Sequence, residues 1–143
     1  MSHEQKPNVP ATDGLPADRP PTLRVVPMPA DTNAAGHIFG GWLMSQVDIA
    51  GSIPAMIRAR GPVATVAVNN FQFHQPVLVG DLISVYAAVA RVGTTSITIE
   101  VEAYGERPIR THGWQVECVK VASATVTYVA IDAEHHKRPV PKE

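Results

Sequence analysis

The chain has 143 residues, of which 45% are hydrophobic and 17% are charged, and its formal net charge is −1. This balance is typical of one globular domain and excludes a mainly disordered chain. Because the sequence contains no block of like charge, we expect neither nucleic-acid binding nor membrane-surface binding.

The compartment is indicated by the cysteine content and by the apolar runs. Cys118 is the single cysteine, so an intramolecular disulfide cannot form, and its strand-like surroundings favour a small buried thiol. No apolar run reaches the roughly 18 residues that a membrane-spanning helix needs. Residues 1–21 lack the apolar centre of a secretion signal. We therefore expect a cytoplasmic protein.

The first predicted elements are a tail, a short strand and a loop. Residues 1–21 hold five prolines and scattered charges, which is typical of a mobile, disordered tail. Residues 22–26 are a short strand candidate, whose length Pro27 and Pro29 limit. Residues 31–41 are rich in Asp, Asn and Gly, which favour turns, and we expect a loop there.

One long helix is predicted from residue 40 to about residue 59. Leu43, Val47 and Ala50 recur at helical spacing and would face a core. Pro54 lies inside this pattern. Because proline has no N–H to bond to the preceding turn, we expect a kink there.

Strand patterns make up the rest of the chain, and their order predicts the fold. A single helix cannot provide parallel crossovers for all of these strands, so an antiparallel sheet wrapped around the helix is expected. This is an α+β hotdog domain over residues 22–132, followed by a polar tail over residues 133–143. The open sheet edge predicts dimerisation. The strands are expected at 63–73, 82–92, 94–104 and 116–131, with a hairpin turn at Gly93 and a longer connection at 105–113.

Asp48 is the residue that most clearly indicates a chemical site. Asp is a poor helix former, and few carboxylates are buried unless a partner or a reaction uses them. The helix N-terminus offers unpaired N–H groups, and Gly40 and Gly41 would let a ligand approach closely. A solvated polar face shared with Ser45 and Ser52 would give the same spacing and stays open as an alternative.

Four segments, taken together and in this order, resemble the bacterial single-hotdog acyl-CoA thioesterases, which carry an aspartate on the central helix. The resemblance covers Leu23 to Asp132, and its first segment is the most specific. It implies a homodimer with shared active sites, assembled into a tetramer or hexamer. It also implies that no metal or prosthetic group is needed. Coenzyme A would be part of the substrate and not a bound cofactor. The segments are DTNAAGHIFGGWLMSQVDIAG, FHQPVLVGD, RVGTTSITIEV and TVTYVAID.

The resemblance also implies roles for particular residues. Asp48 would be the base or nucleophile, and Asn33 from the partner protomer would complete the site. The backbone at Gly40 and Gly41 would bind the substrate carbonyl as an oxyanion site. A thiolate leaves readily, so one base and an oxyanion site would suffice for hydrolysis. A hairpin near the coenzyme A would supply Arg91, Gly93, Thr94, Thr95 and Ser96.

Other interpretations of single residues stay open. Asn33 alone would also serve as a turn residue. His37 is a possible base without an assigned partner, and we expect His74 to be a packed or edge histidine. Phe71 and Phe73 are expected in the core. His135 and His136 do not complete a good metal site. Residues 105–115 match no pattern of the family.

Two other functions, and one other substrate for the thioesterase reaction, compete with hydrolysis of acyl-CoA. A non-catalytic acyl-CoA-binding or regulatory module would use the same fold without needing the Asp48 carboxylate. A hydratase or dehydratase would need a histidine opposite the acid, and none is evident. An acyl-carrier-protein substrate is disfavoured because the chain has no strongly basic patch for an acidic carrier.

Overall fold

The computed structural model describes residues 14–109 and 115–143. Most of the expected mobile tail and part of the expected 105–113 connection lie outside these residues. The elements follow the predicted order. They are β1 (Leu23–Val25), the 3-10 turn η1 (Pro29–Asp31), α1 (Gly40–Ala59), β2 (Val63–Phe73), β3 (Leu82–Val92), β4 (Ser96–Ile109) and β5 (Gln115–Ala130).

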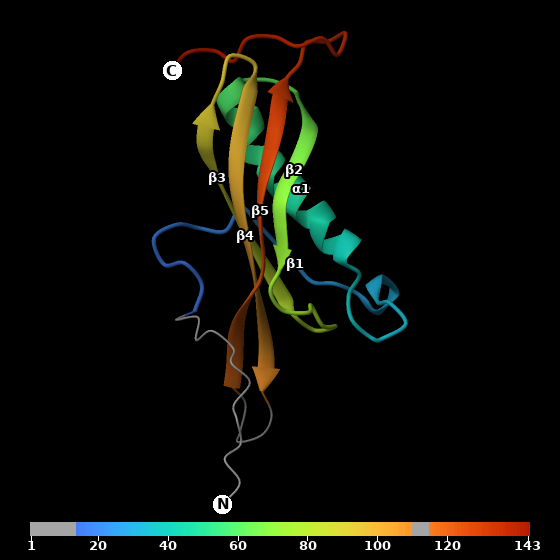
Figure 1. Ribbon diagram of the computed structural model, residues 1–143. Coiled ribbons are helices and arrows are strands. Elements are labelled where there is room, and N and C mark those ends of the chain that lie inside the picture. The colour runs from blue at the N-terminus through green and yellow to red at the C-terminus, as the bar shows by residue number, and fades with distance from the viewer. Residues whose placement is uncertain (1–13, 110–114) are drawn as a thin grey trace, which may run out of the picture.

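The strands form one antiparallel sheet in the order β1-β3-β4-β5-β2, and α1 lies across one face of it (Figure 1). The helix contacts β2, β3, β4 and β5. This arrangement confirms the hotdog fold. The short β1 and the long β2 are the two edge strands, so β2 presents an unpaired edge in a single chain.

The core lies between α1 and the sheet, as the two periodicities predict. Leu43, Val47 and Ala50 are buried on the helix. On β4, every second residue from Ile97 to Ala103 is buried, so the expected strand alternation is confirmed. Each fully buried aliphatic side chain of this kind contributes about 1.5–3 kcal/mol to folding. The packing therefore fixes the rotation of the helix about its axis.

The ends of α1 differ in their capping. Phe39 precedes the helix and offers no side-chain cap, so the Gly40 and Gly41 amides have no acceptor in the described chain. At the other end, Arg60 adopts the left-handed conformation (φ 53°) and closes the helix. The helix continues through Pro54 to Ala59. Ala55 is buried against the sheet, so packing compensates for the hydrogen bond that Pro54 cannot donate.

The expected connection at 105–113 is wrong in its first half, because β4 continues to Ile109. Ile109 pairs with Gln115, so β4 and β5 form a hairpin that is longer than predicted. Glu106 is the last β4 residue with a β3 partner. Beyond Glu106, one edge of β4 has no neighbouring strand. Pro108 is tolerated there because a proline on an open edge need not interrupt the hydrogen bonds between strands.

The C-terminal segment, expected as a polar tail, folds back on the domain. Ile131 forms a bridge with Lys137. The Val140 amide donates to the Thr94 carbonyl at 2.8 Å, and its side chain packs against the core. The segment therefore contacts the β3–β4 turn through Val140.

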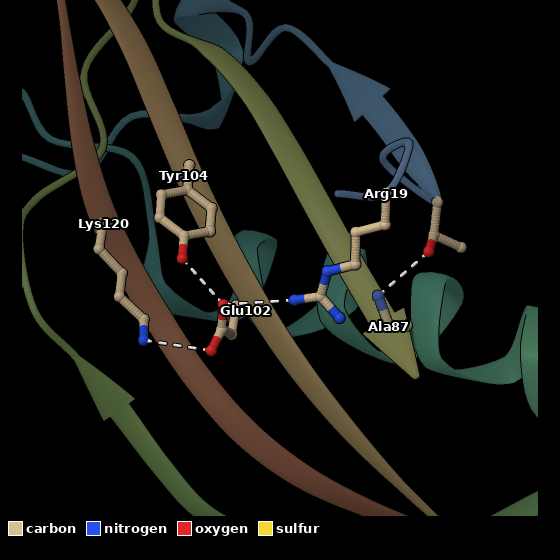
Figure 2. Close-up of polar contacts among 6 residues, drawn as sticks. Arg19, Ala87, Glu102, Tyr104 and Lys120 are labelled. Atoms are coloured by element: carbon tan, nitrogen blue, oxygen red, sulfur yellow. Dashed lines mark hydrogen bonds and ion pairs between the residues drawn. The ribbon is translucent and has the colours of Figure 1, made fainter. Parts of the chain in front are cut away.

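The outer face of the sheet carries a charged network around Glu102 (Figure 2). Its carboxylate accepts a hydrogen bond from the Tyr104 hydroxyl at 2.8 Å and pairs with Arg19 and Lys120, each at 3.5 Å. Arg19 also lies over the Tyr86 ring, 5.3 Å from its centroid. These contacts hold the segment before β1 against the sheet. No helix in the described part of the chain is long and apolar enough to span a membrane.

Candidate active site

Asp48 lies near the middle of α1, half-buried, with its carboxylate turned toward β2 and β5. The Thr65 hydroxyl on β2 donates to Oδ1 at 2.8 Å. The Tyr128 hydroxyl on β5 donates to the same oxygen at 3.1 Å and to the Asp48 backbone carbonyl at 2.8 Å. Within residues 14–109 and 115–143, Oδ2 has no hydrogen-bond partner. One oxygen is thus held by the sheet and the other is available.

The helix serines do not account for the position of Asp48. Ser52 donates to the Ile49 carbonyl within the same helix at 2.7 Å, and neither Ser52 nor Ser45 bonds to the carboxylate. The donors come instead from two strands that lie 17 and 80 residues away in sequence. The hydrogen bonds from the sheet therefore distinguish Asp48 from a residue that merely belongs to a solvated polar face of the helix.

Tyr128, which the sequence patterns did not single out, contacts the Asp48 carboxylate. It is fully buried, and burial, followed by the nearby Asp48 carboxylate, raises the pKa of its phenol. It therefore stays a proton donor at neutral pH. Gly51 makes room for it, since a methyl group at that position would collide with the Tyr128 hydroxyl oxygen. The segment TVTYVAID, which contains Tyr128, was noted in the sequence, but the contact of Tyr128 with Asp48, 80 residues away, is not evident there.

Asn33 is held by its own loop. Its side-chain Oδ1 accepts hydrogen bonds from the backbone amides of Ala35 at 2.9 Å and His37 at 3.1 Å. The Asn33 amide in turn donates to the His37 carbonyl at 2.7 Å. The turn role is therefore present, and it leaves the side-chain Nδ2 as the group that can donate elsewhere. Within one chain, Asn33 and Asp48 do not bond to each other.

A cavity of about 380 Å³ opens at the N-terminal end of α1. It is lined by Asn33, His37 and Gly40, by Phe73 at the end of β2, and by residues that follow β2. Asp48 does not line it. A single chain thus brings Asn33 and the helix N-terminus together, while the helix carboxylate lies apart from them.

Gly40 and Gly41 present the first amides of the helix. In the described structure neither amide donates to a backbone or side-chain acceptor. A Cβ at Gly40 would lie 3.0 Å from the Phe73 ring, whereas a Cβ at Gly41 would meet nothing within 4 Å. Gly40 is therefore needed for close packing, and Gly41 opens toward free space. Together they form a donor pair that suits a developing oxyanion.

The expectation that Phe73 belongs to the core is wrong, because its side chain is 55% exposed. Phe73 is the last residue of an edge strand, and its ring lies against Gly40 in the first turn of α1. Phe71, two residues earlier, packs partly buried against the core, with its ring centroid 4.6 Å from that of Phe73. The position of Phe73 at the end of its strand, directly before a turn, could have indicated that it borders a cavity.

The histidines near the cavity have different partners. His74 is exposed, and its Nε2 lies 2.9 Å from the Ser123 hydroxyl, as fits an edge histidine. The His37 ring has no hydrogen bond to the part of the chain that the structure describes, although it lines the cavity. Neither contacts Asp48, so the carboxylate has hydroxyl donors and no imidazole partner.

The hairpin proposed for coenzyme A lies at the other end of the helix. Its turn is closed by the Gly93 amide, which donates to the Ser96 carbonyl at 2.8 Å. Thr95 accepts from Ala130, and Thr94 accepts from the C-terminal segment. Arg91 is exposed beside it. Since a 20-residue helix is about 30 Å long, one chain does not bring this hairpin to Gly40 and Gly41.

No metal-binding cluster of three or more His, Cys, Asp or Glu side chains occurs among the described residues. His136 lies 3.9 Å from Asp132, and both are at the surface. Cys118, predicted as a small buried thiol, is partly buried on β5. None of these residues approaches the Asp48 carboxylate through a hydrogen bond.

A single long helix on a five-stranded antiparallel sheet, with a tethered carboxylate and an uncapped N-terminus, defines a hotdog-fold enzyme. The chain belongs to the Thioesterase superfamily, whose sequence model matches residues 35–111. It is 46% identical over 125 residues to the acyl-CoA thioester hydrolase YciA of Escherichia coli, covering 85% of this chain and 90% of that protein.

Solved structures agree with this assignment. Cj0915, a hexameric hotdog fold thioesterase of Campylobacter jejuni, superposes with a TM-score of 0.81 at 43% identity, covering 86% of this chain and 91% of that one. HI0827, a hexameric broad specificity acyl-coenzyme A thioesterase, gives a TM-score of 0.78 at 40% identity, covering 91% and 86%. HI0827 has also been solved as an aspartate-to-alanine mutant.

Proposed function

We propose that this protein is an acyl-CoA thioesterase that hydrolyses acyl-CoA to free coenzyme A and a carboxylic acid, with Asp48 as its catalytic carboxylate. The observation that carries the proposal is the arrangement of the carboxylate. Two hydroxyl donors hold Oδ1, and Oδ2 has no partner in the described chain. The relatives named acyl-CoA thioester hydrolase support the reaction, and the geometry supports the residue.

The chemistry needs one carboxylate and one oxyanion site. In one route, Asp48 Oδ2 takes a proton from water while the water oxygen attacks the thioester carbonyl. In the other, Oδ2 attacks directly, and water then hydrolyses the mixed anhydride. In both routes the carbon–sulfur bond breaks and the leaving thiolate takes up a proton. The pKa of the resulting thiol is about 8.5 if it resembles cysteine. The Gly40 and Gly41 amides would stabilise the oxyanion.

We propose that the complete site forms between two protomers. Within one chain, Asn33 lines a cavity that does not include Asp48. Strand β2 has an unpaired edge with exposed Val66 and Val68, which a second copy would cover. Asn33 of one protomer would then direct its Nδ2 to the reaction centre beside Asp48 of its partner. Relatives described as hexameric favour a hexamer built from such dimers.

The remaining parts of the proposal concern the coenzyme and the compartment. The hairpin from Arg91 to Ser96 would contact the nucleotide or pantetheine of a coenzyme A bound to a neighbouring protomer, because one chain keeps it far from the helix N-terminus. We expect no metal or prosthetic group to take part, since a thiolate needs little help to leave. We also expect the enzyme to act in the cytoplasm, where a lone cysteine stays reduced.

The test is thiol release from a panel of acyl-CoAs, short, long and aromatic, by the full chain and by Asp48→Ala. We expect turnover by the wild type and a loss of about a hundredfold or more in the variant, with its unfolding temperature and oligomeric state unchanged. Wild-type protein that binds acyl-CoA but releases no thiol would instead be a binding module. Equal rates for both proteins would remove Asp48 from the mechanism.

A further inference from the structure

We propose that Tyr128 is a positioning residue, which fixes the Asp48 carboxylate so that Oδ2 faces the reacting thioester. This inference rests on the proposed function, because it assigns a role to a neighbour of Asp48. Both protein donors reach the same carboxylate oxygen, Thr65 at 2.8 Å and Tyr128 at 3.1 Å. The carboxylate is therefore prevented from rotating, and the oxygen that remains open is always the same one.

The two donors are not equivalent. In a single chain, Thr65 lies exposed on the edge strand β2, whose pairing depends on a second copy. Tyr128 is fully buried on β5, which is paired on both sides by β4 and β2. Its single proton is shared between Asp48 Oδ1 and the Asp48 backbone carbonyl, at 3.1 Å and 2.8 Å. The Tyr128 hydroxyl, on an interior strand, therefore holds both the backbone and the side chain of Asp48 in place.

Gly51 supports this interpretation independently. It lies three residues after Asp48 and is buried in the interior of the helix, where glycine is a poorer helix former than alanine. A methyl group there would collide with the Tyr128 hydroxyl oxygen and approach its ring to 3.2 Å. The helix therefore has its glycine at the position where the phenol reaches the Asp48 carboxylate.

A purely structural bond between helix and sheet is the competing explanation. Such a bond would affect folding stability and leave the chemistry unchanged. A positioning bond would affect the rate at saturating substrate, because misplacing a reacting group by about 1 Å can cost up to a hundredfold.

The experiment measures thiol release by Tyr128→Phe, which removes only the hydroxyl. We expect kcat to fall about tenfold or more with little change in KM. Tyr104→Phe is the matched control. It also removes a buried phenol that donates to a carboxylate, Glu102 Oε2 at 2.8 Å, on the outer face of the same sheet. We expect its kcat and KM to match the wild type.

A double-mutant cycle shows whether Tyr128 acts through Asp48. If it does, Tyr128→Phe costs nothing further in an Asp48→Ala background. An equal loss in both backgrounds, or an unchanged kcat in Tyr128→Phe, would overturn the proposal. An Asp48→Ala protein as active as wild type would instead remove the proposed function itself.

Gly51→Ala decides the matter if Tyr128→Phe does not fold. It displaces the hydroxyl while keeping the tyrosine, and it places a better helix former in α1. We expect kcat to fall in this variant as well. A folded Gly51→Ala protein with wild-type kcat would also overturn the positioning role.

Discussion

The Arg107 guanidinium donates to the Asp81 carboxylate at 2.9 Å and to the Pro76 carbonyl at 3.0 Å. The same Asp81 oxygen accepts the Leu78 amide at 2.9 Å, so the pair closes the turn between β2 and β3. Asp81 is only 1% exposed. Burial raises the pKa of its carboxyl, and the Leu78 amide and the Arg107 charge oppose that rise. The turn that borders the cavity is thus fixed by a nearly buried ion pair.

Removing Arg107 leaves this carboxylate buried without its charged partner. We expect Arg107→Ala to lower the free energy of unfolding by about 3 kcal/mol, as measured by urea denaturation. Arg24→Ala is a matched control, because it removes an exposed ion pair of the same 2.9 Å length to Glu106 and should cost about 1 kcal/mol or less. Equal effects of the two changes would show that burial of Asp81 does not matter.

Gly41 is expected to separate activity from stability. Its missing Cβ would meet nothing within 4 Å, so Gly41→Ala should fold as well as the wild type. If the Gly41 amide binds the substrate carbonyl, the added methyl would obstruct it, and kcat/KM should fall at least about tenfold. Thiol release and thermal unfolding of the same preparation measure both quantities. An unchanged kcat/KM would place the oxyanion site elsewhere.

All three tyrosines are expected to make the protein sensitive to alkali. Burial is the main cause that raises the pKa of Tyr86, Tyr104 and Tyr128, and neighbouring carboxylates add to it for Tyr104 and Tyr128. Because each folded-state pKa lies above the unfolded value of about 10, the neutral phenols contribute stability below pH 10 that is lost as the pH rises further.

The free energy of unfolding should therefore decline above about pH 10, by up to about 1.4 kcal/mol per pH unit for each tyrosine. Urea denaturation over this range gives the slope, and ultraviolet absorbance of tyrosinate should appear together with unfolding. Tyr128→Phe should reduce the slope by the share of one tyrosine. Tyrosinate forming near pH 10 in the folded protein would contradict the assigned burial.

Shared sites predict complementation between inactive subunits. In a mixed dimer of Asn33→Ala and Asp48→Ala chains, one of the two composite sites receives both wild-type residues. We expect mixing or co-expression to restore thiol release that neither variant shows alone. If Asn33 and Asp48 of one chain served the same site, no mixture would contain an intact site, and activity would stay at the level of the single variants.

Local patterns predicted much of this fold because its elements have strong periodicities. The helix over 40–59 follows from the spacing of Leu43 and Val47, and β2 and β3 match the expected ranges. The extension of β4 to Ile109 was missed because Pro108 suggests a loop. Only the pairing with β5 shows that β4 has an open edge there.

Candidate site residues could be predicted only where they lie close together in the sequence. Asp48, Gly40 and Gly41 were predicted because one helix carries them. Tyr128 was missed because its contact with Asp48 spans 80 residues and depends on sheet order. Phe73 was assigned to the core because its composition fits a strand, while its exposure depends on its place at the end of an edge strand. Contacts of this kind depend on tertiary packing.

The most direct test of the central claim is the rate of thiol release by Asp48→Asn at saturating acyl-CoA. Asparagine keeps the size of the side chain and can still accept from Thr65 and Tyr128, but it carries neither charge nor basic oxygen. We predict a kcat at least about a hundredfold below that of the wild type, with an unchanged fold and oligomeric state. A kcat within about twofold of the wild type would contradict the assignment of Asp48 as the catalytic carboxylate.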